Sequence, residues 1–491
     1  MRSFLVLGGL CFGLAEIIQA APQVTADMDP NRFHEKKVDT RALTFNEAVA
    51  LMQQNSSKLA ASEAGVKSSE LQKEALKGLG GPQLLVTGRW GYHDLNLALP
   101  VSKLKAMEIN LADNFLQNRI PTWIQPLLNH DEVPLGPAVE KMYIKGEDHF
   151  GAAILMWPIY TGGLVTSVKK LSVGRLHEEQ ANDAKTYAEE HRKLVERYFG
   201  AVLLREVAKI RREAVGVVAH HDYLAQRAME EGVIAKVERL QATVALADAK
   251  KNALKAKNDS ELAELALNKL LALEEEVVEK TPLFVHKEFL QSKEELIELA
   301  LQEHPGEKRV KAKKQQAQAL KTASTAAWKP TVSLVAIHEL KRHKANKMVG
   351  VNVGWLLYSS VDRRKMAKAA EEKLRQAELS QQDADSDIKL LIEKDWRALE
   401  NARETFFALD SNLKAAKEYM RLREKGLEQG VSTFTDLRDA QINLEKNQTE
   451  RLKAALDYVI ALNELVTSAG HPELFEKFLA TSESVSYTHL R

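Results

Sequence analysis

The sequence predicts a mainly α-helical chain with a small β part, built as an internal twofold repeat. Three observations predict this class. Two segments that lie 198 residues apart match each other, long proline-free runs show helical spacing of apolar residues, and shorter stretches before those runs alternate between apolar and polar residues. A long internal match predicts a repeated architecture, helical spacing predicts helices, and a period of two predicts strands.

The duplication is clearest at residues 430–444, which read GVSTFTDLRDAQINL and match residues 232–246, GVIAKVERLQATVAL. The same offset carries Trp157 and Tyr160 onto Trp355 and Tyr358. A duplication of this length favours two halves over several independent domains. We therefore expect a first repeat at residues 43–271 and a second repeat at residues 293–470, joined by an acidic and then apolar linker, 272–292.

Both ends of the chain fall outside the repeats. Residues 1–20 combine a basic start, an apolar stretch and a small-residue cleavage site after Ala20. They predict a secretory signal peptide, followed by an N-terminal segment, 21–42. The one cysteine, Cys11, lies in that signal, so we expect no disulfide or thiol chemistry in the mature chain. Residues 471–491 are expected to form a C-terminal tail, of which 485–491 resemble a translated sequencing adapter and are interpreted as an artefact.

Composition and spacing argue against several functions. The net charge of +1 predicts no nucleic-acid partner. His220 and His221 are neighbours on a predicted helix and point about 100° apart, so they do not form a two-ligand metal face. No other polar grouping converges on a catalytic arrangement. We therefore expect no enzyme activity, no cofactor and no metal site.

Each repeat follows the same order of elements. A kinked helix (43–78 and 293–326) precedes a β-hairpin, a long helical run (164–228 and 363–428) and a return helix (237–271 and 436–467). A helix of sixty or so residues is on the order of 90–100 Å long, which no globular core needs. Small and apolar residues in steps of seven, or of four and three, predict that these helices pair as coiled coils.

The two hairpins differ in length. Pro82 to Trp157 spans 75 residues, whereas Pro330 to Trp355 spans 25, so the first hairpin is expected to carry a long loop at 93–148. Loops of this length are usually functional or disordered, and both a gating or recognition role and a tolerated insertion stay open. The last strand is expected to run from Val349 to Leu357.

Two hairpins give four strands per chain, which cannot close on themselves and would expose their edges. Three chains would supply a closed, 12-stranded trimeric β-barrel with an apolar face toward lipid and a polar face toward a lumen. Aromatic residues gather at the strand ends, where an aromatic girdle at the membrane interface is expected. They are Trp157, Tyr160, Trp328, Trp355 and Tyr358.

Four motifs carry a resemblance to a known family. They are LTFNEAVALMQQNS from residue 43, MWPIYTGG from residue 156, EEGVIAKVERLQA from residue 230 and EQGVSTFTDLRDA from residue 428. Over residues 43–470 the chain resembles the outer-membrane efflux protein family, the TolC-like channel-tunnels of tripartite efflux and type I secretion. The resemblance implies a homotrimer, with its β-barrel in the outer-membrane lipid of a Gram-negative cell and an α-barrel of coiled-coil helices in the periplasm.

The resemblance also implies partners and a gate. The partners would be a periplasmic adaptor (membrane fusion) protein and an inner-membrane RND or ABC transporter. Asp436 and Asp439 match two aspartates that ring the family's periplasmic entrance, and Glu238 matches an acidic residue that takes part in closing it. Helix capping is the other interpretation of Asp436. The turns at Gly232, Val233, Gly430 and Val431 are expected to need left-handed backbone and to dock the adaptor.

One departure from the family concerns the closed state. The best-known member has an arginine and a tyrosine at the positions of Ser432 and Leu427, and these residues hold its entrance shut. This chain therefore needs different contacts to close. We expect a passive exit duct driven by an inner-membrane pump; the alternative is a periplasmic coiled-coil structural or adaptor protein without a pore, which would not require the paired amphipathic hairpins.

Overall fold

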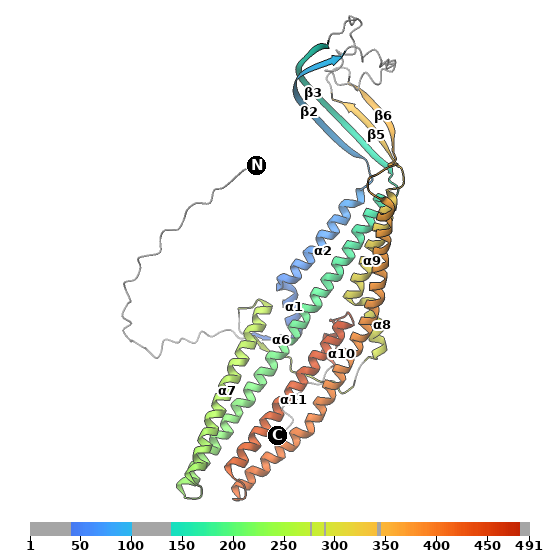
Figure 1. Ribbon diagram of the computed structural model, residues 1–491. Coiled ribbons are helices and arrows are strands. Elements are labelled where there is room, and N and C mark those ends of the chain that lie inside the picture. The colour runs from blue at the N-terminus through green and yellow to red at the C-terminus, as the bar shows by residue number, and fades with distance from the viewer. Residues whose placement is uncertain (1–40, 101–138, 275–276, 289–290, 341–344, 482–491) are drawn as a thin grey trace, which may run out of the picture.

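The computed structural model describes residues 41–100, 139–274, 277–288, 291–340 and 345–481. A four-stranded sheet lies at one end of an elongated molecule, and long helices extend from it to the other end (Figure 1). Within the described ranges, no helix combines the length and the apolarity that crossing a membrane requires.

The predicted kinks are confirmed in both helices that precede the sheet. In the first repeat α1 (Phe45–Asn55) and α2 (Ser57–Ala75) are separated at Ser56, and a short 3-10 turn, η1 (Leu76–Gly78), follows. In the second, α8 (Lys293–Glu303) and α9 (Pro305–Ala326) are separated at His304, because proline disfavours helical backbone at the residue before it. Thr44 begins α1 with a full capping box, which it forms with Glu47.

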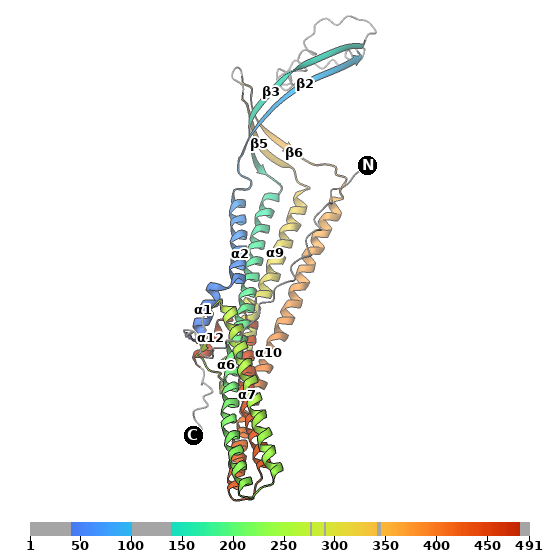
Figure 2. The same ribbon diagram turned by 90° about the vertical axis from the view of Figure 1, so that its left-hand side faces the viewer.

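The long helices end within two residues of their predicted bounds. They are α6 (Leu164–Glu230) with α7 (Lys236–Leu271), and α10 (Arg363–Glu428) with α11 (Phe434–Ser468). Each pair runs antiparallel from the middle of the molecule to a turn at the far end (Figures 1 and 2). The structure therefore places both turns together, about as far from the sheet as the fold allows.

The sheet has the order β2 (Gln83–Pro100), β3 (Val139–Tyr160), β5 (Thr331–Glu339) and β6 (Lys347–Gly354), and all neighbours are antiparallel. The expectation that the last strand reaches Leu357 is wrong, because β6 ends at Gly354. The carbonyls of Leu356 and Leu357 accept hydrogen bonds from the Arg363 guanidinium, at 2.7 and 3.0 Å, instead of pairing with β5.

The predicted loop at 93–148 is wrong at both ends. The β2–β3 ladder continues from His93, opposite Gly146, to Pro100, opposite Val139. Residues 95–99 still alternate as LNLAL, and β2 ends at a proline, which has no N–H to donate to a ladder. The rest of the predicted loop, 101–138, lies outside the described residues.

The four strands predicted from the two hairpins form one sheet, and a second, two-stranded sheet was not predicted. β1 (Arg41–Leu43) pairs in parallel with β4 (Val277–Glu279), so the described residues contain six strands. Three residues are too few for an alternating pattern to be recognised in the sequence. Tyr198 joins the two strands' ends, since its hydroxyl donates to the Leu43 carbonyl at 2.7 Å and accepts from the Thr281 amide at 3.0 Å.

The C-terminal tail predicted from residue 471 onward contains a helix, α12 (Leu474–Ala480). Its Phe475 is fully buried. The ring packs with those of Phe45, Phe199 and Phe284, at centroid distances of 5.2–5.9 Å. These aromatic rings are the centre of the main hydrophobic core, which α1, α6, α11, α12 and the linker build in the middle of the molecule.

Candidate gate at the helix tips

Both tip turns have the same backbone geometry. In the first, the Val233 amide bonds to the Ala228 carbonyl at 2.8 Å and the Gly232 amide to that of Met229 at 3.0 Å. The second repeats this pattern, with Val431 to Gly426 at 2.8 Å and Gly430 to Leu427 at 3.1 Å. This is the Schellman pattern, which ends a helix with one left-handed residue.

The left-handed backbone expected at the tip glycines is confirmed, with φ of 73° at Gly232 and 74° at Gly430. Each glycine is followed by an exposed valine, since Val233 keeps 72% and Val431 77% of its surface in solvent. Among the described residues, neither valine belongs to a hydrophobic core. Each tip therefore exposes one valine side chain to solvent at the far end of the molecule.

Asp436 caps the start of α11. Its Oδ2 accepts from the Thr433 amide at 3.0 Å and from the Thr433 hydroxyl at 2.9 Å, and its own amide donates back to that hydroxyl at 3.1 Å. These hydrogen bonds, led by the one from the Thr433 backbone and helped by Arg423, lower the pKa of Asp436. The carboxylate is therefore ionised at neutral pH and is held in place as part of the helix cap.

Asp439 lies one helical turn further along α11 and is largely exposed. Its Oδ1 accepts from Nε and Nη2 of the adjacent Arg438, at 3.2 and 3.0 Å. Glu238 lies in the first turn of α7, at the other tip. In the described part of the chain, no hydrogen bond or ion pair joins Glu238 to either aspartate, so a single chain does not bring the three predicted carboxylates together.

An arginine–tyrosine pair that the sequence reasoning missed lies beside the second tip. The Arg423 guanidinium lies over the Tyr419 ring, 5.1 Å from its centroid, and 3.9 Å from Asp436 Oδ2. The signal in the sequence is the four-residue spacing on α10, which puts both side chains on one face. Leu427 instead packs into a small cluster with Met420 and Leu437, where it has no polar role.

The two helix pairs also touch each other near the tips. The Thr435 hydroxyl of α11 donates to Gln241 Oε1 of α7 at 3.2 Å. A cavity of about 30 Å³, lined by His221 of α6 and by Phe434, lies beside this bond and has room for a water molecule. Burial, and then the neighbouring His220, lower the pKa of His221 to about 4, so its ring is neutral at physiological pH.

The five predicted girdle residues all lie at the junction between sheet and helices, and all are exposed. Trp157 and Tyr160 are on β3, Trp328 follows α9, and Trp355 and Tyr358 follow β6. The Trp355 indole donates to the Trp328 carbonyl at 3.2 Å, and the Arg363 guanidinium lies 5.0 Å from the Trp328 ring centroid. The structure therefore brings Trp328 and Trp355 together and fixes them with Arg363.

No cluster of three or more potential metal ligands occurs among the residues that the structure describes. The tips place carboxylates, the arginines that contact two of them and exposed valines at the end of two long, paired helices.

The comparisons with known proteins agree with this architecture. A model of the outer membrane efflux protein family matches residues 296–471, and no curated protein matches the chain. The resemblance found in the sequence is thereby confirmed for the second repeat by an independent family model.

The fold is that of outer-membrane channel proteins. The chain is similar to VceC from Vibrio cholerae, with a TM-score of 0.67 and 11% identity over 87% of this chain and 96% of that one. It is similar to CmeC from Campylobacter jejuni, with a TM-score of 0.68 and 14% identity over 89% of both chains. It is also similar to the open state of MtrE from Neisseria gonorrhoeae, with a TM-score of 0.66 and 14% identity over 87% of this chain and 89% of that one. The mainly helical fold class predicted from the sequence is confirmed.

Proposed function

We propose that this protein is one subunit of a trimeric channel in the outer membrane, an exit duct without enzyme activity. The observation that carries the proposal is the face of the four-stranded sheet. Because residues opposite each other in an antiparallel ladder share a face, the ladder puts one apolar set on the same side of all four strands. Its exposed members are Leu84, Val86, Trp90, Leu155, Trp157, Leu334, Val349, Val351 and Val353.

An apolar face of this extent is unfavourable in water. The opposite face carries Thr87, Ser333 and Asn352 among small and apolar residues, which suits a water-filled lumen better than lipid. Three copies would close four strands each into a 12-stranded barrel and remove the free edges of β2 and β6. The helices would then continue from this barrel as a tunnel through the periplasm.

The tips would form the periplasmic entrance. In a threefold assembly Asp436 and Asp439 would each be repeated three times at one level, and rings of carboxylates favour cations. Glu238 would contribute from the first tip. The exposed Val233 and Val431, with Gly232 and Gly430, would offer the adaptor protein its docking points, and an RND or ABC transporter in the inner membrane would drive efflux or type I secretion.

Planar-bilayer recording of the purified protein tests this function. We expect a small, cation-selective conductance that rises, with weaker selectivity, in the double variant Asp436→Asn, Asp439→Asn. The matched control is Asp248→Asn on α7, since Asp248 pairs with Lys251 on its own helix face. A protein that is silent in bilayers and is recovered from the soluble periplasmic fraction would instead be a coiled-coil structural or adaptor protein.

A further inference from the structure

The short helix α12 lies where both repeats and the linker meet, beside α1 in Figure 2. The buried Phe475 fastens it to α1, α6 and the linker, as described above. Just before α12, Gly470 lies against the joint between α8 and α9, where an added Cβ would come within 2.7 Å of the Glu303 carbonyl carbon. The segment therefore contacts elements of both repeats.

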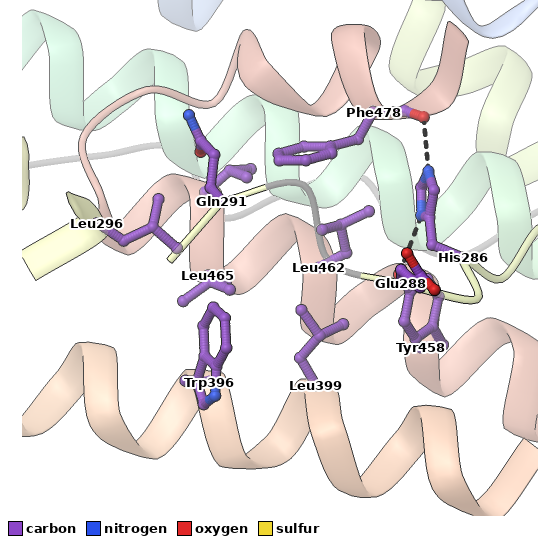
Figure 3. Close-up of a pocket in the computed structure, with 11 residues that line it drawn as sticks. His286, Glu288, Gln291, Leu296, Trp396, Leu399, Tyr458, Leu462, Leu465 and Phe478 are labelled. Carbon is purple, nitrogen blue, oxygen red and sulfur yellow. Dashed lines mark hydrogen bonds between the residues drawn. The ribbon is translucent and has the colours of Figure 1, made fainter. Parts of the chain in front are cut away.

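One polar contact fixes α12 to the linker. Nε2 of His286 lies 2.9 Å from the Phe478 carbonyl, and Nδ1 lies 3.0 Å from the Tyr458 hydroxyl (Figure 3). A carbonyl only accepts, so Nε2 carries the proton and donates to α12. Nδ1 of the neutral ring then accepts the Tyr458 proton. Both nitrogens are therefore fully used by the neutral form of the ring.

The surroundings of His286 disfavour a second proton. The residue is only 8% exposed. It borders a cavity of about 20 Å³ whose other walls are mainly apolar, as Figure 3 shows for Leu399, Leu462 and Leu465. An imidazolium would direct a second N–H at the Tyr458 hydroxyl, which would have to turn its own proton away. Burial accordingly lowers the pKa of His286.

The charged groups near this contact do not offset that cost. Glu288 of the linker lines the same cavity. Arg403 of α10 donates to the Lys287 carbonyl at 3.2 Å. On α12, Lys477 is exposed, and Glu476 points to a different histidine. Among the described residues, no carboxylate is bonded to the His286 ring.

That other histidine makes a second contact with α12. His191 of α6 is fully buried, with Nδ1 3.0 Å from Asn463 Oδ1 and Nε2 3.3 Å from Glu476 Oε1. α12 is therefore attached to α6 through Glu476 as well as to the linker through the Phe478 carbonyl.

We propose that α12 is a pH-dependent clasp, closed while the His286 ring is neutral and loosened from the linker when that ring takes up a second proton. Because the pKa of His286 lies below the ordinary value of 6.5 when the clasp is closed, the open form binds more protons. The closed form is at full stability above about pH 6.5 and loses stability as the pH falls below it. The proposal concerns the fold of the chain and does not depend on the channel function.

Hydrogen–deuterium exchange of the purified full-length protein tests the clasp. Protection of residues 470–481 is measured at pH 7.5 and 5.5, with intrinsic exchange rates corrected for pH. We expect protection to fall by roughly threefold to tenfold at pH 5.5, since one pKa unit corresponds to about a tenfold change in the equilibrium. The C-terminal part of α11 serves as the internal reference for exchange.

The variant His286→Gln keeps a donor for the Phe478 carbonyl but has no titrating group at this position. The exchange protection of residues 470–481 in this variant should therefore not depend on pH. The matched control is His221→Gln, the same change at a half-buried histidine beside the tips, which should keep the wild-type response. Tyr458→Phe removes the donor to Nδ1 and should lower protection already at pH 7.5. Three results would disprove the clasp. They are equal protection of residues 470–481 at both pH values in the wild type, an unchanged pH response in His286→Gln, and wild-type protection at pH 7.5 in Tyr458→Phe.

Discussion

At the scale of single residues, one alanine adopts a backbone conformation that favours glycine. Ala272, at the end of α7, has φ of 53° and is the one non-glycine residue with positive φ among those described. Gly470, 198 residues later, has φ of 86° at the end of α11. Left-handed backbone brings the Cβ of an L-residue too close to the next carbonyl, at a cost of roughly 1–2 kcal/mol.

Replacing Ala272 by glycine should therefore stabilise the protein. Glycine also makes the unfolded chain more flexible, which offsets part of the gain, so we expect a net increase of about 0.5–1 kcal/mol in the free energy of unfolding. Urea unfolding followed by circular dichroism measures it. Gly470→Ala is the matched reverse change and should destabilise, since its Cβ would also meet the Glu303 carbonyl carbon at 2.7 Å. A loss of stability in Ala272→Gly would contradict the strain.

At the scale of elements, one arginine fastens the first helix pair near its tip. Arg239 of α7 donates to both oxygens of Asp222 on α6, at 2.5 and 3.3 Å, and to Gln226 Oε1 at 2.5 Å. The two charged side chains are only 19% and 17% exposed. Removing one partner from such a pair leaves the other charge poorly solvated.

We expect Arg239→Gln to destabilise the α6–α7 tip by about 2–3 kcal/mol, because it leaves the Asp222 carboxylate without its partner. Asp222→Asn alone should cost less, and the double variant should be more stable than the sum of the single effects predicts. Local hydrogen exchange of residues 222–245 measures each of them. Purely additive effects in this double-mutant cycle would show that the pair does not fasten the tip.

The long helices were predictable because their signal extends over many turns. Sixty residues of helical spacing fix α6 and α10, and the glycines at 232 and 430 mark where the chain must turn. The three-residue strands β1 and β4 and the seven-residue α12 were missed, because contacts with distant residues, such as Tyr198 with Leu43, stabilise them. Local sequence carries little of that information.

For the candidate gate, the sequence predicted which residues lie at the tips but not what they bond to. The capping of Asp436 by Thr433 follows from a spacing of three, which the sequence shows. The approach of Arg423 to Asp436 depends on how α10 packs against α11, which no local pattern specifies. A carboxylate ring involves three chains, so it stays a prediction that rests on the assembly.

At the scale of the whole molecule, the proposed trimer places the free edge of one subunit's sheet beside the free edge of the next subunit's sheet. In one chain β2 and β6 are the two outer strands of the sheet, and Val86 and Val351 lie on its shared apolar face. If three chains close the barrel, β6 of each subunit pairs with β2 of the next. A cysteine at each position would then lie within reach of a cysteine on the neighbouring subunit.

We therefore expect the double variant Val86→Cys, Val351→Cys to be cross-linked by a short bis-maleimide into covalent species that end at three chains. The background is low, because the one native cysteine, Cys11, lies in the predicted signal peptide. Either single variant, which lacks one of the two facing thiols, should give no trimer. Denaturing gel electrophoresis separates the outcomes: a product of one chain would leave the sheet edges unpaired, and a ladder that continues past three would mean an open assembly instead of a closed barrel.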